Sequence, residues 1–444
     1  MRAPYIPHVF GEEVREKLQS RRGWFCAAVA SSVPWPKKDV WIQYGGDDFI
    51  LRGTENDAEP SAPSISVPKG TLSAEEILAK VYRLSSVLSW FLGGYVDVVS
   101  HIHGSHPMTF GAQMRQAFST VGQFGNKAFN CNHMPIIEDE NVRIALAFWR
   151  EGERLTRVHD SYAFLSYFKV IESQFQNSKA RVAWFNHNID QVGGDAADRV
   201  TALRASGTDV GIHLYDSGRC AVAHASLGRD IVDPDIPEDR QRIALDLVLM
   251  RELARRFIAL NLEVPTAQST FTSRDRLSPW DSLIASETLE TLRAGGTPEV
   301  PLGIDRQQVT VRLWPDGPIT GLETMDMHVD VVHEGQVRVV LFNPNMTLML
   351  LFILDYRNGR VHNLLDHGSL LKNDRHPICE NDVRAFATVF HSVIGNAVVE
   401  LCIDGLEPVE CEVVIPVNII PRIPSEAVEE AIDAFRLQQG RSTE

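Results

Sequence analysis

The stretch from residue 212 to residue 225 reads IHLYDSGRCAVAHA, and it is the most informative segment of the chain. It places Arg219 five residues before His224. Apolar side chains at helical spacing precede it in residues 157–176 and 198–205, and a long amphipathic run, 237–262, follows after a loop. Because the connections between these runs are short, we expect them to pack as an antiparallel helical bundle around this stretch.

The spacing of Arg219 and His224 predicts an oligomer. Residues five apart on an α-helix differ by about 140° in azimuth and by roughly 7.5 Å along the axis. One copy of the chain would therefore point the two side chains in different directions. Two copies related by a twofold axis could bring Arg219 of one and His224 of the other into one cleft. We therefore expect a homodimer that forms through the helical bundle.

The motif RCAVAH at 219–224, with Leu-Tyr-Asp before it at 214–216, resembles the Arg–His motif of the HEPN superfamily in its Apea-like branch. The upstream sequence YFKVIE, which ends at Glu172, is also similar to an earlier helix of that family. The resemblance covers residues 157–262. It implies a HEPN-like bundle whose dimer builds a composite cleft for single-stranded RNA.

The resemblance also implies a metal-independent endoribonuclease, in which a ribose 2′-hydroxyl attacks the adjacent phosphate. His224 would act as general acid or base near neutral pH, and Arg219 would hold the phosphate oxygens as charge accumulates on them. Active members carry Asn, Asp or His after the arginine, whereas this chain has cysteine there, which loses a polar contact. The supporting residues of this predicted site are Glu172, Tyr215, Asp216 and Cys220.

Two interpretations without catalysis stay open. In one, Arg219 pairs with Glu172 or Asp216, and His224 is a hydrogen-bonded core residue. In the other, the bundle binds RNA or pairs two chains without cleaving anything. The surroundings of Arg219 separate these interpretations, because exposure in a cleft at a twofold axis favours cleavage, whereas burial against Glu172 favours an interaction protein.

The net charge of -15 is concentrated towards the C-terminal end of the 444-residue chain. Residues 1–156 carry 16 basic and 17 acidic side chains, residues 157–262 carry 13 and 14, and residues 263–444 carry 14 and 27. A near-neutral middle permits a local positive cleft, whereas the C-terminal part would repel a phosphate backbone. We therefore expect that RNA would bind to the bundle, and that a protein partner would bind to the acidic C-terminal part.

The length predicts several domains, because one hydrophobic core stops growing at roughly 250–300 residues. We predict an α+β, multi-domain protein. Its parts are an N-terminal α/β domain in residues 1–156, the helical bundle in residues 157–262, a linker with at most one short helix in residues 263–304, and a mostly antiparallel β domain with a final helix in residues 305–444.

Local patterns supply the elements of the outer domains. Residues 24–33 and 39–52 have the composition of strands. Residues 71–101 have helical spacing, with a capping box at Ser73 and Glu76 and a break near Gly93 and Gly94. After residue 304 the period changes to two. The predicted strands are 309–314, 327–333, 336–343, 346–356, 397–404 and 410–417, and the predicted helices are 382–395 and 425–437.

The sequence also predicts a compartment. The six cysteines form no CxxC pair, which favours a reducing environment. The first residues, MRAPYIPHVFGEEVREKL, become charged before an apolar run develops, so we expect no secretory signal. The longest apolar run, around residues 346–354, is about half a membrane span, so we expect no membrane association. A cytoplasmic protein is the resulting prediction.

Two groups of histidines are candidate metal ligands. The first consists of His101, His103 and His106. Alternating histidines at the end of a helix are more typical of a capped loop than of a metal site. The second is looser and consists of His362, His367, His376 and His391. The sequence contains no dinucleotide fingerprint, P-loop, hydrolase elbow or zincin motif. We therefore predict neither a metal nor a cofactor.

Across its whole length, including the opening APYIPHVFG, the chain also resembles the MauJ proteins of methylamine utilisation in the order of its segments. That resemblance implies an accessory role in the expression or maturation of an amine dehydrogenase. Two function classes therefore remain: a dimeric, HEPN-like RNA-binding protein or endoribonuclease, and a non-catalytic accessory or interaction protein.

Overall fold

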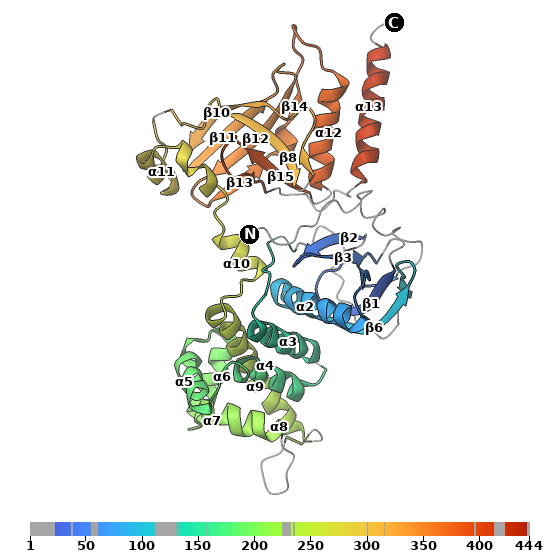
Figure 1. The fold of residues 1–444 in the computed structure, drawn as a ribbon. Coiled ribbons are helices and arrows are strands. Elements are labelled where there is room, and N and C mark those ends of the chain that lie inside the picture. Colours follow the sequence, from blue (N-terminus) through green and yellow to red (C-terminus); the bar gives the residue numbers. More distant parts are fainter. Residues whose placement is uncertain are drawn as a thin grey trace. The chain divides into compact units, whose positions relative to one another are not determined.

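The computed structural model describes residues 23–36, 39–54, 61–111, 131, 133–156, 158–223, 232–233, 236–299, 301–314, 316–394, 397–412 and 422–441. The chain forms two compact units, and the first extends to Phe271 while the second continues from Thr272. Figure 1 labels their elements. The predicted fold class is confirmed, because strands and helices mix, the middle is helical, and an antiparallel sheet precedes a final helix.

A five-stranded sheet, in the order β2-β3-β5-β1-β6, lies in the N-terminal part. Its strands are β1 Trp24–Ser31, β2 Val40–Tyr44, β3 Asp47–Arg52, β5 Ser64–Pro68 and β6 Val96–Gly104, and a separate pair consists of β4 Ser61–Ala62 and β7 Phe110–Gly111. The predicted strand 39–52 is a hairpin of β2 and β3. It turns at Gly45 and Gly46, whose φ values of 57° and 83° suit a tight turn.

Helix α2, Ala74–Leu92, packs against β1 and β6. The predicted capping box is confirmed: the Glu76 N–H donates to the Ser73 hydroxyl at 3.2 Å, and the Ser73 N–H donates to the Glu76 carboxylate at 2.8 Å. The helix ends at Gly93, which adopts the left-handed conformation. The predicted continuation of this helix to residue 101 is wrong. Residues 96–104 form β6, which pairs with the whole of β1 and is rich in β-branched side chains.

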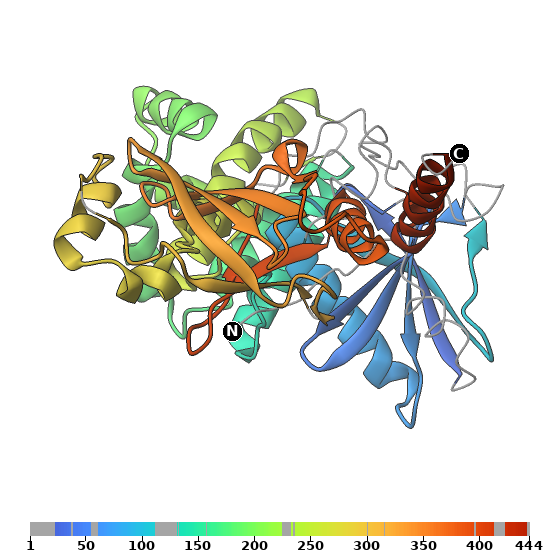
Figure 2. The same cartoon turned by 90° about the horizontal axis from the view of Figure 1, so that it is seen from above.

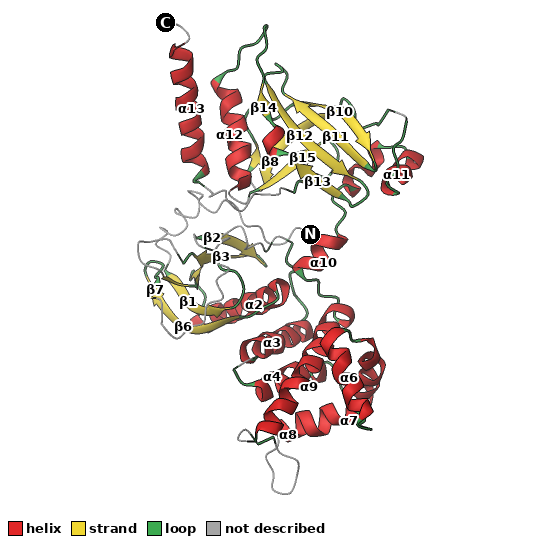
Figure 3. Cartoon of the chain, turned by 180° about the vertical axis from the view of Figure 1, so that it is seen from behind, coloured by secondary structure: helices red, strands yellow, loops and turns green. Residues whose placement is uncertain are grey.

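The rest of the first unit is mostly a helical bundle (Figure 3). Its α-helices are α3 Glu140–Leu155, α4 Asp160–Glu172, α5 Ser178–Asn188, α6 Gly194–Ala205, α7 Val210–His213, α8 Ala221–Ala223 and α9 Pro237–Arg256. Helix α4 is central, because it packs against both α3 and α9. Helix α3 also packs against α2. The boundary that the sequence predicted at residues 156 and 157 therefore falls between two helices that touch each other.

Two segments of the bundle are π-helical: η3, Leu214–Cys220, and η4, Phe257–Asn261. At the end of η3, the Ala221 N–H donates to the carbonyl of Asp216, five residues earlier. The informative stretch of the sequence is therefore not a regular α-helix. Since a π-helix has a wider turn, the 140° separation expected of an α-helix does not hold throughout this stretch.

The second unit contains a nine-stranded sheet whose paired strands are antiparallel. Its order is β13-β12-β11-β10-β8-β15-β16, with β14 beside β12 and β9 beside β8. The bounds are β8 Gln308–Trp314, β9 Gly317–Pro318, β10 Met325–His333, β11 Gln336–Phe342, β12 Leu348–Asp355, β13 Arg360–Asn363, β14 Ser369–Leu370, β15 Val398–Cys402 and β16 Val409–Glu410. Alternate side chains of β8 and β11 are buried, as the period of two predicted, and Figure 2 shows the twist of the long strands.

Two helices accompany this sheet. Helix α12, Glu380–Ile394, contributes Ala385, Val389 and Val393 to the core that the sheet buries. Helix α13, Pro424–Arg441, packs against α12. Both helices were predicted. Of the predicted strand 410–417, only the start belongs to β16, and residues 413–417 lie outside the described residues.

The predicted linker, 263–304, is not a plain connection. It contains α10 Ala267–Ser273, the 3-10 helix η5 Ser278–Leu283 and α11 Ser286–Arg293, whereas the sequence predicted at most one short helix. Leu277, Trp280 and Leu292 are fully buried in the core of the second unit. Burial of these side chains stabilises short helices that would be marginal alone, which explains the error.

None of the helices within the described residues combines the length and the apolar composition needed to cross a membrane.

Candidate functional site

Arg219 lies beside Glu172 where α4, α5 and η3 meet. Its Nη2 is 3.3 Å from Glu172 Oε1, and the Nη1 of Arg181 donates to the same oxygen at 2.7 Å. The guanidinium carbons of Arg181 and Arg219 lie 5.1 Å and 6.0 Å from the centre of the Tyr215 ring. The side chains of Arg219 and Glu172 are each 24% exposed. We call Glu172, Arg181, Tyr215 and Arg219 the arginine cluster.

Close helix packing positions the arginine cluster. Gly218 precedes Arg219, and a Cβ atom added at Gly218 would lie 2.5 Å from the Phe164 ring on α4. Glycine therefore lets η3 approach α4 more closely than any other residue would. Glu172 is the last residue of α4, and its partner Arg181 belongs to α5. The ion pairs of the cluster thus connect three elements at one point.

Three of the predicted site residues come together in the arginine cluster. Asp216 is exposed on η3 and makes no ion pair with any residue that the structure describes, and Cys220 is partly exposed at the end of η3. His224 lies outside the described residues. The pairing of Arg219 with Glu172 is one of the two pairings that we expected for a protein without catalysis.

A second charged group, which we call the Asp246 network, joins α6, α7 and α9. Asp246 is fully buried. Its Oδ1 accepts hydrogen bonds from Arg199 Nε at 2.8 Å and Nη2 at 2.7 Å, and its Oδ2 is 2.8 Å from His213 Nε2. Arg242 Nη1 is 3.9 Å from the same Oδ2 and donates to the Ser217 carbonyl of η3 at 2.6 Å. The network therefore also fixes the backbone just before Gly218.

Sequence reasoning did not single out this network. His213 stands in the informative stretch, but its partner lies 33 residues away on another helix. The signal that could have found it is Asp246 itself, an acidic residue inside the apolar run of α9, because a charged residue is almost never fully buried unless it is paired.

The arginine cluster has the composition of an anion-binding site that contains its own counter-ion. Two guanidinium groups share one carboxylate, so the four side chains carry one net positive charge. An incoming phosphate or carboxylate would find planar donors and an aromatic face, but it would have to displace or share Glu172. The cluster is therefore better arranged for holding helices together or for weak anion contact than for strong stabilisation of a transition state.

The ring centres of His101 and His103 lie 6.0 Å apart, but the two residues do not form a metal site with a third residue of the described chain. Among the described residues, no three His, Cys, Asp or Glu side chains are placed so that they could hold a metal ion. His101 and His103 lie on strand β6 rather than at the end of a helix, which corrects the prediction. Their ring centres lie 5.1 Å and 4.9 Å from that of Phe25 on β1, so they pack beside this strand. In the second unit, His362 lies on β13 and His391 on α12.

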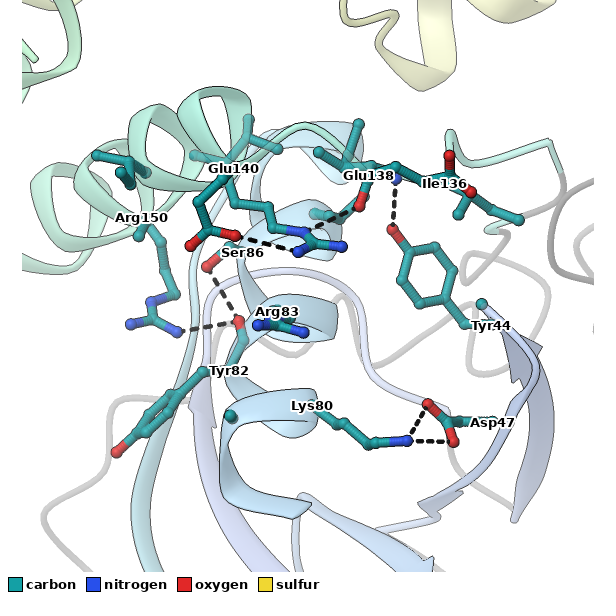
Figure 4. A pocket seen from close by; sticks show the side chains of 18 of the residues that line it. Tyr44, Asp47, Lys80, Tyr82, Arg83, Ser86, Ile136, Glu138, Glu140 and Arg150 are labelled. Carbon is teal, nitrogen blue, oxygen red and sulfur yellow. Dashed lines mark hydrogen bonds and ion pairs between the residues drawn. The ribbon is translucent and has the colours of Figure 1, made fainter. Parts of the chain in front are cut away.

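A cavity of about 500 Å³ lies between α2, the β2–β3 hairpin and the start of α3 (Figure 4). Sequence reasoning named none of its lining residues. They come from three separate segments, 44–49, 79–87 and 136–150, and no motif connects these segments.

Comparison with known proteins adds one finding to this geometry. Residues 145–259 match the family model of the methylamine utilization protein MauJ. The matched part, about a quarter of the chain, begins within α3 and ends within η4, so it contains both the arginine cluster and the Asp246 network. No curated protein and no solved structure matches the chain. The MauJ resemblance thus has support in this region, and the HEPN resemblance stays a prediction.

Proposed function

We propose that the protein is a non-catalytic accessory protein of methylamine utilisation, with the helical bundle as its interaction module. The MauJ match carries this proposal, because it falls on the bundle. The ion pair between Arg219 and Glu172 supports it, since the pair engages the arginine within the fold. The proposed role lies in the expression or maturation of an amine dehydrogenase.

Deletion of the gene in a methylamine-growing host tests this proposal. Growth on methylamine and the amine-dehydrogenase activity of extracts should fall, while growth on succinate should not change. Complementation with Arg219→Lys should restore both, because lysine keeps the charge that pairs with Glu172. Arg240→Lys, at an exposed position of α9, is the matched control. Normal growth and normal dehydrogenase activity in the deletion strain would contradict the proposal.

Metal-independent RNA cleavage is the second candidate. The observation that favours it is the π-helix η3, because π-helical turns are frequent at functional sites and this one contains Tyr215, Arg219 and Cys220. In this proposal, two copies of the chain would combine Arg219 of one with His224 of the other. Glu172 would release Arg219 when RNA binds.

Cleavage of single-stranded RNA by chelator-treated protein, with 2′,3′-cyclic phosphate ends, would support this second candidate. Arg219→Lys should then lose activity, because lysine lacks the planar pair of donors that holds phosphate oxygens. Cys220→Asn should raise activity, since it introduces a polar side chain beside the arginine. If neither the wild-type protein nor Cys220→Asn cuts RNA, and Arg219→Lys complements growth fully, the accessory function stands alone.

A further inference from the structure

The cavity between α2 and α3 has the dimensions of a small-molecule site. Its volume of about 500 Å³ lies within the range of ordinary ligand pockets. Helix α2 forms one side, the β2–β3 hairpin a second, and the segment before α3 with the first turns of α3 a third (Figure 4). Part of its lining is apolar and includes Phe49, Val87, Ile136 and Ile144. A hydrocarbon chain would therefore gain free energy by leaving water for this part of the cavity.

Charged side chains complete the lining. The cations are Lys80, Arg83, Arg143 and Arg150, and the carboxylates are Asp47, Glu138 and Glu140. Two of the cations are already paired. Lys80 Nζ lies 2.6 Å and 2.7 Å from the two oxygens of Asp47, and Arg143 Nη1 lies 3.1 Å from Glu140. The lining as a whole carries one more positive than negative charge.

Arg83 and Arg150 are the cations that pair with no carboxylate of the described lining. Arg83 is exposed on α2 and makes no hydrogen bond or ion pair with any residue of the described chain. The side chain of Arg150 is 15% exposed, and its Nε lies 3.9 Å from Asp97 Oδ1, which is too far for a hydrogen bond. Its Nη1 donates to the Tyr82 carbonyl at 3.2 Å, and its buried Nε makes no hydrogen bond with the described residues. Burial lowers the pKa of Arg150.

An anionic ligand would give the Arg83 guanidinium a charged acceptor and would add a counter-charge near Arg150. Hydrogen bonds from a guanidinium to a carboxylate are among the strong ones in proteins. In Figure 4, the Arg150 side chain extends from α3 to the Tyr82 carbonyl on α2. Arg83 follows Tyr82 on the same helix. Among the carboxylates of the lining, Glu138 is the one that makes no ion pair with a described residue, and it is exposed on the segment before α3. It opposes a second negative charge on the ligand.

We infer that this cavity binds a small amphipathic monocarboxylate, whose carboxylate is held by Arg83 with Arg150 beside it and whose hydrocarbon chain lies on the apolar lining. The net charge of the lining selects a single negative charge, and its apolar part selects a chain rather than a compact polar anion. This site lies outside the arginine cluster, and it does not depend on the proposed function.

Titration calorimetry of the full chain tests the inference. The probes are the straight-chain carboxylates from butanoate to decanoate, with octanamide as the uncharged and octylamine as the cationic counterpart. At least one carboxylate should bind with a dissociation constant in the millimolar range or below, and octanamide and octylamine should bind at least ten times more weakly. Failure of every carboxylate to bind at millimolar concentration would overturn the inference, as would binding of octanamide or octylamine as tight as that of octanoate.

Two variants localise the binding. Arg83→Gln should weaken carboxylate binding about ten- to a hundred-fold, the usual effect of losing a hydrogen bond to a charged group. Arg240→Gln is the matched control, because Arg240 is also an exposed helical arginine and makes no ion pair within the described residues. Ala79→Trp should abolish binding by filling the cavity at an exposed helical position without a change of charge. Unchanged affinity in Arg83→Gln and Ala79→Trp would place the bound carboxylate elsewhere and overturn the inference.

Discussion

Replacement of Asp246 by asparagine should strongly destabilise the bundle. Asp246 is fully buried; its Oδ1 accepts two hydrogen bonds from Arg199, and its Oδ2 lies 2.8 Å from His213 Nε2. Asparagine keeps the shape but removes the charge, so the Arg199 side chain, 16% exposed, loses its counter-ion. Removing one partner of a buried ion pair costs about 3–5 kcal/mol, and we expect about 3 kcal/mol because asparagine retains one acceptor.

Urea unfolding measures this loss. With a slope of roughly 1–3 kcal/mol per molar urea, a loss of about 3 kcal/mol should lower the midpoint of the bundle's transition by about 1 M or more. Since the chain has two compact units, hydrogen exchange of peptides from α6 and α9 should accompany the optical signal and assign the transition to the bundle.

Glu252→Gln on the same helix is the matched control. Glu252 pairs with Arg255, whose side chain is 49% exposed, so its loss should cost no more than about 0.5 kcal/mol. If Asp246→Asn unfolds at the same urea concentration as this control, and the α6 and α9 peptides exchange as in the wild type, the network does not hold the bundle together.

Four further outcomes follow from the structure. Gly218→Ala should destabilise the bundle by about 1–3 kcal/mol, because its Cβ would overlap the Phe164 ring. Gly193→Ala, at the N-cap of α6 with open space around its Cβ, should cost only about 0.5 kcal/mol in the same urea titration. Ser73→Ala should cost about 1 kcal/mol, read as faster hydrogen exchange in the first turn of α2, because it removes the capping hydroxyl. Burial, with the nearby Arg422 cation, lowers the pKa of His391 in the folded state. The unfolded state therefore binds the proton more readily than the folded state does. The contribution of neutral His391 to the free energy of unfolding is complete above about pH 6.5 and is lost as the pH falls towards the folded pKa. His391→Gln should flatten the dependence of the free energy of unfolding on pH over this window. Sedimentation should give twice the 49.6 kDa of one chain if the predicted homodimer forms, and a monomer at micromolar concentration would remove the composite Arg–His site.

Local signals were sufficient for several elements. The capping box at Ser73 and Glu76 and the stop at Gly93 set both ends of α2, because each depends on hydrogen bonds and backbone angles within a few residues. The period of two after residue 304 predicted most strands of the second sheet, since each strand buries one face and exposes the other. The pairing of Arg219 with Glu172 was one of two pairings that the motif itself suggested.

Tertiary contacts decided the remainder. Residues 96–104 are a strand because β1 offers them a pairing edge along its whole length, although their spacing continued a helical pattern. Helices α10 and α11 and the 3-10 helix between them lie where the sequence indicated a linker, because buried side chains such as Trp280 secure this segment to the second core. The Asp246 network and the cavity beside Arg83 each unite segments that are tens of residues apart. The sequence by itself determined the elements whose stabilising contacts lie within one turn or one strand, whereas only the tertiary structure decided which distant charges meet, because that depends on how the elements pack.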